Sequence, residues 1–144
     1  MVMASCRECR QAVSDEALIC PQCGAPKPAD QAWTGSGYEY RSEMELFGLP
    51  FIHIAWGRDQ QGRRRVARGI IAVGRFARGL VVFGQFGIGL ITVAQFGLGA
   101  VGLFQFGIAA ALIGQFAAGA WAIGQFIAVL HDGLGQVVWK FPGL

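Results

Sequence analysis

The sequence predicts an all-β chain in two parts, a small N-terminal ribbon followed by a β-solenoid built on a ten-residue repeat. Three observations predict this organisation. The dipeptide Gln-Phe recurs every ten residues from Gln85 to Phe126. The stretch from Gly79 to Leu130 has no charged side chain, although the chain of 144 residues carries a net charge of +3. The four cysteines of the chain form two close pairs near the N-terminus.

The cysteine pairs follow the pattern C-x2-C, ten residues, C-x2-C, and consist of Cys6, Cys9, Cys20 and Cys23. Four thiolates in two such pairs suit a structural, tetrahedral Zn²⁺ with no open coordination position. A segment of about forty residues is too small for an unaided core, so the metal is expected to supply folding energy. Val13, Leu18 and Ile19 are its expected apolar cover. Two disulfides are the alternative, but the first residues show no secretory signal, which predicts a reducing, cytoplasmic compartment.

This stretch resembles the short zinc ribbons at the N-termini of many bacterial and archaeal proteins. The resemblance covers about Cys6 to Pro28 and depends on the four cysteines and the C-P-x-C-G knuckle. It implies a metal-stabilised adaptor for a protein partner. We therefore place a zinc ribbon at residues 1–28. Residues 29–37 are rich in small, polar and glycine residues and predict a flexible linker.

Residues 38–68 are expected to form entry strands and an arginine-rich cap. The alternation from Tyr38 to Phe47 and the run from Phe51 to Trp56 predict two strands. His53 is expected to be a packed or edge histidine and not a ligand. The arginines after it are candidate contacts for an anion or a lipid surface: Arg58, Arg63, Arg64, Arg65 and Arg68. A solvated cap, a flank for anionic lipid and a nucleic-acid contact remain as alternative interpretations.

The ten-residue period favours extended chain over helix. On an α-helix ten residues advance about 1000°, so successive Gln-Phe pairs would fall on different faces. A strand has a period of two, so ten residues return each side chain to the same face. Small residues near every fifth place, such as Gly84 and Gly89, indicate corners. The pattern is therefore typical of a β-solenoid, which we place at residues 69–130.

We expect about twenty residues per coil, because a ten-residue coil is too tight to hold phenylalanines inside. The expected repeat core is Phe76, Phe86, Phe96, Phe106, Phe116 and Phe126, in two ladders that face each other across the interior. The expected glutamine ladder is Gln85, Gln95, Gln105, Gln115 and Gln125. Residues 131–144 are expected to form a C-terminal cap, in which Asp132, Lys140 and Pro142 block further stacking.

Residues from about Gly69 to Ala128 resemble the pentapeptide-repeat class of quadrilateral β-helices. In that class the middle residue of each five is Leu or Phe and the residue two before it is small, as in Gly84 before Phe86. The chain departs from it by placing apolar residues such as Leu98 at the remaining positions. A looser resemblance, to uncharacterised bacterial proteins, depends on G-L-P-F-I-H-I and A-R-G-I-I-A-V-G. Both resemblances imply a fold and no activity.

The surplus of apolar residues must be covered by other copies or by lipid, since soluble monomers rarely expose large apolar patches. The main alternative fold is two or three transmembrane helices across Ile70 to Leu130. No catalytic constellation appears, so an enzyme is not expected. The leading prediction is a scaffolding protein that forms a homo-oligomer or filament, with the ribbon as adaptor. A membrane-associated protein with a cytoplasmic ribbon is the alternative, and a nucleic-acid-associated factor is a distant one.

Overall fold

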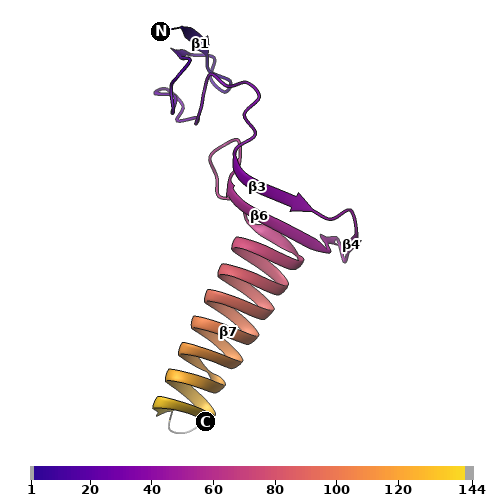
Figure 1. Ribbon diagram of the computed structural model, residues 1–144, viewed down its shortest axis with the longest axis vertical. Helices are drawn as coiled ribbons and strands as arrows, with labels where there is room; N and C mark the ends of the chain where they lie inside the picture. The colour runs from indigo at the N-terminus through magenta and orange to yellow at the C-terminus, as the bar shows by residue number, and fades with distance from the viewer. Residues whose placement is uncertain (1, 142–144) are drawn as a thin grey trace. The chain divides into compact units, whose positions relative to one another are not determined.

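The computed structural model describes residues 2–141, which form strands, turns and loops and no helix (Figure 1). The all-β fold class is therefore confirmed. Within these residues no helix is available to cross a membrane, so the alternative of transmembrane helices was wrong. The chain divides into two compact units. The ribbon unit comprises Met1–Gly37 and Gly57–Arg65, and the coil unit comprises Tyr38–Trp56 and Val66–Leu144.

The ribbon unit is built on one short antiparallel hairpin. Strand β1 (Met3–Ser5) pairs with β2 (Ala12–Ser14), with Ala4 opposite Val13. Val13 is buried beside Cys6 and Cys20, as expected for so small a core. Leu18 and Ile19 are 75% and 64% exposed, so the expected apolar cover was wrong for these two residues.

The coil unit begins with two strands that the sequence predicted in outline. Strand β3 (Ser36–Arg41) lies beside β6 (Ile52–Arg58), which lies beside β7 (Ala67–Lys140). Between β3 and β6, β4 (Glu45–Leu46) and β5 (Leu49–Pro50) form a small hairpin. The predicted strand at residues 38–47 is therefore broken after Arg41.

His53 of β6 is buried and hydrogen-bonded on both ring nitrogens. The backbone N–H of Arg68 donates to Nδ1 at 2.8 Å, and Nε2 lies 3.3 Å from the Glu39 carboxylate. Nδ1 also lies 3.0 Å from the carbonyl oxygen of Arg68, so the ring contacts both backbone polar groups of that residue. The Glu39 carboxylate also forms an ion pair with the Arg41 guanidinium, at a distance of 2.7 Å. His53 therefore acts as a packed histidine that joins β3, β6 and the start of β7, and the predicted assignment agrees with this.

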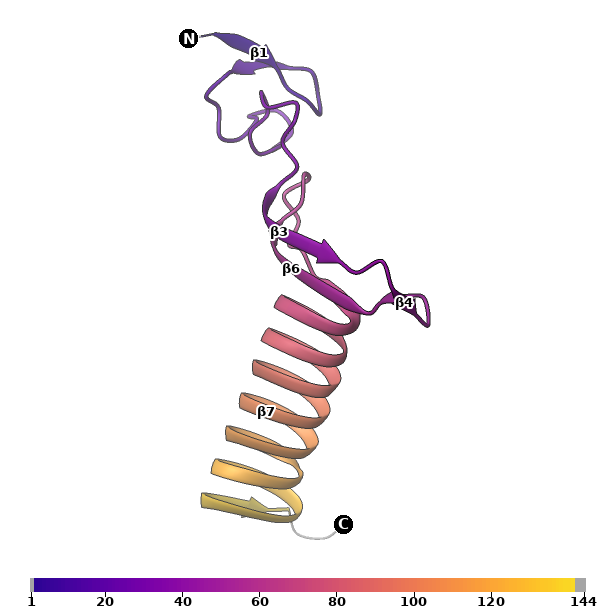
Figure 2. The ribbon, with the colours of Figure 1, turned by 45° about the vertical axis from the view of Figure 1, so that its right-hand side comes forward.

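The repeat forms one long strand, β7, that winds as a coil (Figures 1 and 2). One turn takes ten residues, because the rings of phenylalanines ten positions apart stack with centroids 4.7–5.3 Å apart. That spacing matches neighbouring strands in a sheet. The prediction of twenty residues per coil was therefore wrong. All six rings lie in a single row, and the predicted pair of ladders facing each other is absent.

The first turn of the coil also takes ten residues if an inserted segment is left out of the count. Ile52 of β6 pairs in parallel with Ile71 of β7, nineteen positions later. The nine residues Gly57–Arg65 between them belong to the ribbon unit. Without that insertion the first turn would also take ten residues.

The interior of the coil is filled by small side chains. Each turn has two five-residue sides whose inward residues meet: a side chain added at Gly87 would contact Thr92 and Val82. The phenylalanines point outward, and the last five of the row are 42–46% exposed. The prediction of a phenylalanine core was therefore wrong. Its premise was sound, since ten residues per turn leave no room inside for stacked rings.

Phe104 is the exception and lies inside, with only 3% of its surface exposed. Its ring occupies space that Gly97, Gly102 and Gly107 leave, because a Cβ added at any of the three would overlap the ring. The coil therefore accommodates one large inward side chain here because three neighbouring positions carry no side chain.

Strand β7 continues to Lys140, so the predicted cap at residues 131–144 begins inside the coil. Lys140 and Asp132 form an ion pair of 2.9 Å on the last turn. The hydrogen bond from Lys140 lowers the pKa of Asp132 below its ordinary value. Pro142, the third predicted cap residue, lies outside the described residues.

Candidate metal centre and apolar faces

The two cysteine knuckles share one backbone geometry. In the first, the N–H of Arg10 donates to the carbonyl of Cys6, and the N–H of Cys6 donates to Gln11. In the second, the N–H of Gly24 donates to the carbonyl of Cys20, and the N–H of Cys20 donates to Ala25. Both turns therefore close in the same way and present their cysteines to the same point.

Both turns also need a left-handed residue at the same position. Gly24 has φ of 75° and Arg10 has φ of 62°. The sequence indicated the first through its glycine, but Arg10 carries no such signal. A side chain in this region costs free energy, of order 1 kcal/mol.

The four Sγ atoms lie within 4.8 Å of one another. Cys6 Sγ is 3.7 Å from Cys23 Sγ, and Cys9 Sγ is 3.6 Å from Cys20 Sγ. A tetrahedral ion with metal–sulfur bonds of about 2.3 Å separates its ligands by about 3.8 Å, whereas a disulfide bond is about 2.05 Å long. The four predicted ligands are thus positioned to bind one metal ion, and all four cysteines are free thiols.

Backbone N–H groups favour the thiolate at the first cysteine of each pair. The N–H of Cys9 lowers the pKa of Cys6 to about 6, and the N–H of Cys23 lowers the pKa of Cys20. The N–H of Gln11 lowers the pKa of Cys9, but shielding from water and the neighbouring thiols outweigh it and raise that pKa to about 12. Four thiols this close cannot all ionise without a cation between them. A bound metal ion would supply that charge.

Arg7, inside the first knuckle, ties the later part of the ribbon unit to the metal centre. Its guanidinium lies 4.8 Å from the ring centroid of Trp33 and donates to the carbonyl of Pro26 at 3.2 Å. It also donates to the carbonyl of Gln60 at 2.5 Å. Trp33 belongs to the segment predicted as a flexible linker, so this part of residues 29–37 packs against the ribbon.

The candidate anion-binding arginines fall into two groups. Arg58 donates to the carbonyl of Gly62 at 3.0 Å, and Arg65 donates to the carbonyl of Thr34 at 2.8 Å. The first bond lies within the hairpin Gly57–Arg65, and the second joins that hairpin to the segment before β3. Arg63, Arg64 and Arg68 have exposed side chains, as does Arg58. The cluster is therefore partly structural.

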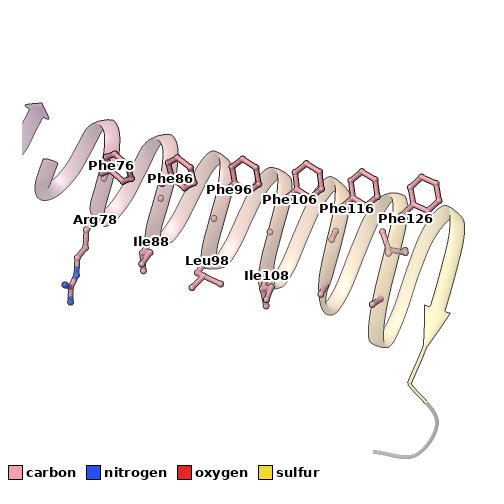
Figure 3. Close-up of a pocket in the computed structure, with 18 of the residues that line it drawn as sticks. Phe76, Arg78, Phe86, Ile88, Phe96, Leu98, Phe106, Ile108, Phe116 and Phe126 are labelled. Atoms are coloured by element: carbon pink, nitrogen blue, oxygen red, sulfur yellow. The ribbon is translucent and has the colours of Figure 1, made fainter. Parts of the chain in front are cut away.

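A first apolar surface, here called the Phe face, covers one side of the coil (Figure 3). One of its rows is Phe76, Phe86, Phe96, Phe106, Phe116 and Phe126. The second row, two positions further along each turn, is Arg78, Ile88, Leu98, Ile108, Ala118 and Ala128. Together they line a groove of about 930 Å³. Arg78 is the one charged side chain among its lining residues.

A second apolar surface, here called the aliphatic face, covers the other side. Its rows include Ile91, Val93, Val101, Leu103, Ile113, Trp121 and Ile123, which line a groove of about 610 Å³. Since the inward residues of the two sides meet, the two faces point in opposite directions. Sequence reasoning anticipated an apolar exterior but assigned no residue to either face.

The glutamine row follows one narrow edge of the coil between the two faces. All five glutamines, from Gln85 to Gln125, are exposed. Arg75 begins the row and donates to the side chain of Gln85 at 2.9 Å. The edge is therefore polar along its height, whereas both faces are apolar.

The site and fold thus describe an all-β protein that joins a four-cysteine metal centre to a ten-residue coil with two apolar faces. Comparison with family models, curated proteins and solved structures gave no match.

Proposed function

We propose that this chain is a non-enzymatic structural protein that self-associates through the two apolar faces of its coil. The observation that carries the proposal is the exposure of large apolar side chains on both sides of the same strand. On the Phe face Ile88 and Ile108 are 55% and 58% exposed, and on the aliphatic face Leu103 is 54% exposed. Burying such surface contributes about 25 cal/mol per Å², which favours association.

The arrangement of the faces supports an open assembly over a closed dimer. Contact through one face leaves the opposite one exposed, so association continues until both are covered. The constant spacing of the rows also suits contact with another row of the same spacing, as in dry interfaces between stacked sheets. The polar glutamine edge then remains in water. Lipid around the whole coil would instead leave five amide side chains in an apolar medium, which is costly.

The ribbon unit is proposed to hold one structural Zn²⁺ and to act as an adaptor for a protein partner. The support is the closed set of four thiols at the separations zinc requires. With four cysteine ligands no position is left for a substrate. The role of this unit is therefore stabilisation and display of a surface, which the exposed hairpin arginines extend.

Three charge substitutions on neighbouring turns test the assembly. Ile108→Glu lies on the Phe face, Ile113→Glu on the aliphatic face and Gln105→Glu on the polar edge. We expect sedimentation velocity to show large assemblies for the wild-type protein and for Gln105→Glu. Each face variant should stop at small species, because the other face alone can only pair, and the double face variant should be monomeric.

Three results would overturn this proposal. If the wild-type protein is monomeric without lipid at all concentrations, or if both face variants assemble like the wild type, the faces do not mediate association. If the wild-type protein instead cofractionates with vesicles only, the membrane alternative replaces self-association. Salt-sensitive binding of DNA or RNA that Arg63→Ala and Arg64→Ala abolish would favour the distant nucleic-acid alternative.

A further inference from the structure

We propose that the Phe face pairs with the Phe face of a second copy and that the two coils run antiparallel. This inference rests on the proposed self-association and specifies its geometry. A two-fold axis along the strand direction places each row of one copy opposite the same row of the other. The phenylalanine rows then meet, and the second rows meet beside them.

The first argument is the size of the side chains in the second row. The row is bulky at Ile88, Leu98 and Ile108 and small at Ala118 and Ala128, and the last turn adds Val137 and Trp139 to the same groove. Centred between Phe96 and Phe106, an antiparallel pair sets Ile88 of one copy opposite Ala118 of the other. Ile88 therefore faces a small residue, while Leu98 of one copy meets Ile108 of the other at the centre of the interface. Pairing a large residue with a small one on the flanking turns is how facing layers fill space without voids.

A parallel pair distributes the same volumes badly. Ile88, Leu98 and Ile108 of both copies would lie on the same three turns, and Ala118 and Ala128 of both copies on the next two. The two faces would then be wedged apart at the early turns and leave a void at the late ones. Because voids and overpacking both destabilise an interface, the taper disfavours the parallel arrangement.

The second argument is charge. Arg78 stands at the early end of the second row and is the one charged residue lining the groove. In a parallel pair the two Arg78 side chains lie at the same level. In the antiparallel pair they lie five turns apart, roughly 24 Å at the spacing of strands in a sheet. Each guanidinium then lies level with Ala128 of the other copy, away from the second guanidinium.

The size of the face sets the expected affinity. Six turns at about 4.8 Å and a side of five residues give a flat area on the order of 450 Å². Stable complexes bury about 800 Å² on each partner. A pair formed through the Phe face alone should therefore be weak, in the micromolar range or above, and the measurement must reach such concentrations.

The test uses the full-length, zinc-loaded chain carrying Ile113→Glu, so that the aliphatic face cannot contribute. Dimerisation is measured by sedimentation equilibrium for this chain and for versions with Ile88→Ala, Ala118→Ile or both. Ala118→Ile should raise the Kd about tenfold, because the new side chain would overlap Ile88 of the other copy. The double substitution exchanges large and small, so it should return the Kd to within about threefold of the starting chain.

A second readout reports the orientation directly. With Lys27→Arg, Lys140 is the one remaining lysine, and it lies on the last turn of the coil. A short amine-reactive cross-linker should label Lys140 without joining two Lys140 side chains, because antiparallel coils place them at opposite ends. The expected result is a dimer in which no cross-link joins the two Lys140 side chains.

The outcomes separate this inference from the proposed function. A dimer whose two substitutions have independent effects and whose Lys140 side chains cross-link overturns the antiparallel geometry and leaves self-association intact. A chain with Ile113→Glu that stays monomeric even at millimolar concentration overturns pairing through the Phe face altogether. Adding Ile108→Glu to the chain that carries Ile113→Glu should abolish the dimer. That loss would confirm that the dimer forms through the Phe face.

Discussion

The rings of Phe106 and Phe116 lie parallel, with an interplanar angle of 0° and centroids 4.7 Å apart, although ten residues separate them in the chain. The distance equals the spacing of neighbouring strands. Each turn of β7 therefore places its phenylalanine directly on that of the previous turn. The same row stabilises the coil from outside and gives the Phe face its apolar character.

Removing a central ring should weaken the coil. Phe106 stacks on both Phe96 and Phe116, so Phe106→Ala loses two ring pairs. Each pair contributes about 0.5–1.5 kcal/mol, and we expect a loss of about 1–3 kcal/mol in the free energy of unfolding by urea. Phe47 at the turn between β4 and β5 is 88% exposed, so Phe47→Ala is the matched control, with an expected change below about 0.5 kcal/mol. Equal effects at both positions would contradict the role of the row.

The glycines around Phe104 should tolerate no side chain. Gly102→Ala places a methyl group into the ring, and such overpacking costs about 1–3 kcal/mol. Phe104→Ala alone should destabilise by about 3–5 kcal/mol, because it leaves a cavity. The double variant should be more stable than the sum of the two changes predicts, since the added methyl group partly fills that cavity. Thermal unfolding of the four proteins measures this coupling, and strict additivity would argue against the contact.

The two knuckles should respond in opposite ways to substitution at their left-handed positions. Gly24→Ala meets no atom within 4 Å but must adopt φ of 75°, so we expect a loss of about 1 kcal/mol. Arg10→Gly relieves the same strain in the first knuckle and should be neutral or stabilising. Competition with a chromogenic zinc chelator compares the two variants. Weaker zinc binding by Arg10→Gly than by Gly24→Ala would contradict this account.

Metal removal should unfold one unit and spare the other. The ribbon unit has a small core around Cys6, Val13, Cys20 and Ala25, so we expect a strong chelator to abolish its structure. The coil has its own interior and inter-turn pairing, so its far-ultraviolet β signal should persist. Amide hydrogen exchange measured with and without chelator distinguishes the units, and Cys20→Ser should reproduce the chelated state. Loss of protection throughout the coil would show that the two units depend on each other.

Much of the metal centre could be predicted from the sequence, because it depends on local spacing. Two C-x2-C pairs leave the chain few ways to bring four sulfurs together, and the structure places all four within 4.8 Å. Arg10 as a left-handed residue and Arg7 as a bridge to Trp33 could not be predicted. No pattern of residue types marks the left-handed conformation of Arg10 or the contact of Arg7 with Trp33. Both depend on the path that the backbone takes after a turn.

For the coil, the sequence by itself determined that the chain is extended and that residues ten apart share a face, because only a strand keeps that register. The number of residues per turn and the choice of inward side were decided by the tertiary structure. Alternation assigns residues to two faces without saying which face is enclosed. The enclosed volume settles that choice: a ten-residue turn has room for glycine, alanine and an occasional larger side chain such as Phe104, so the phenylalanine row must lie outside.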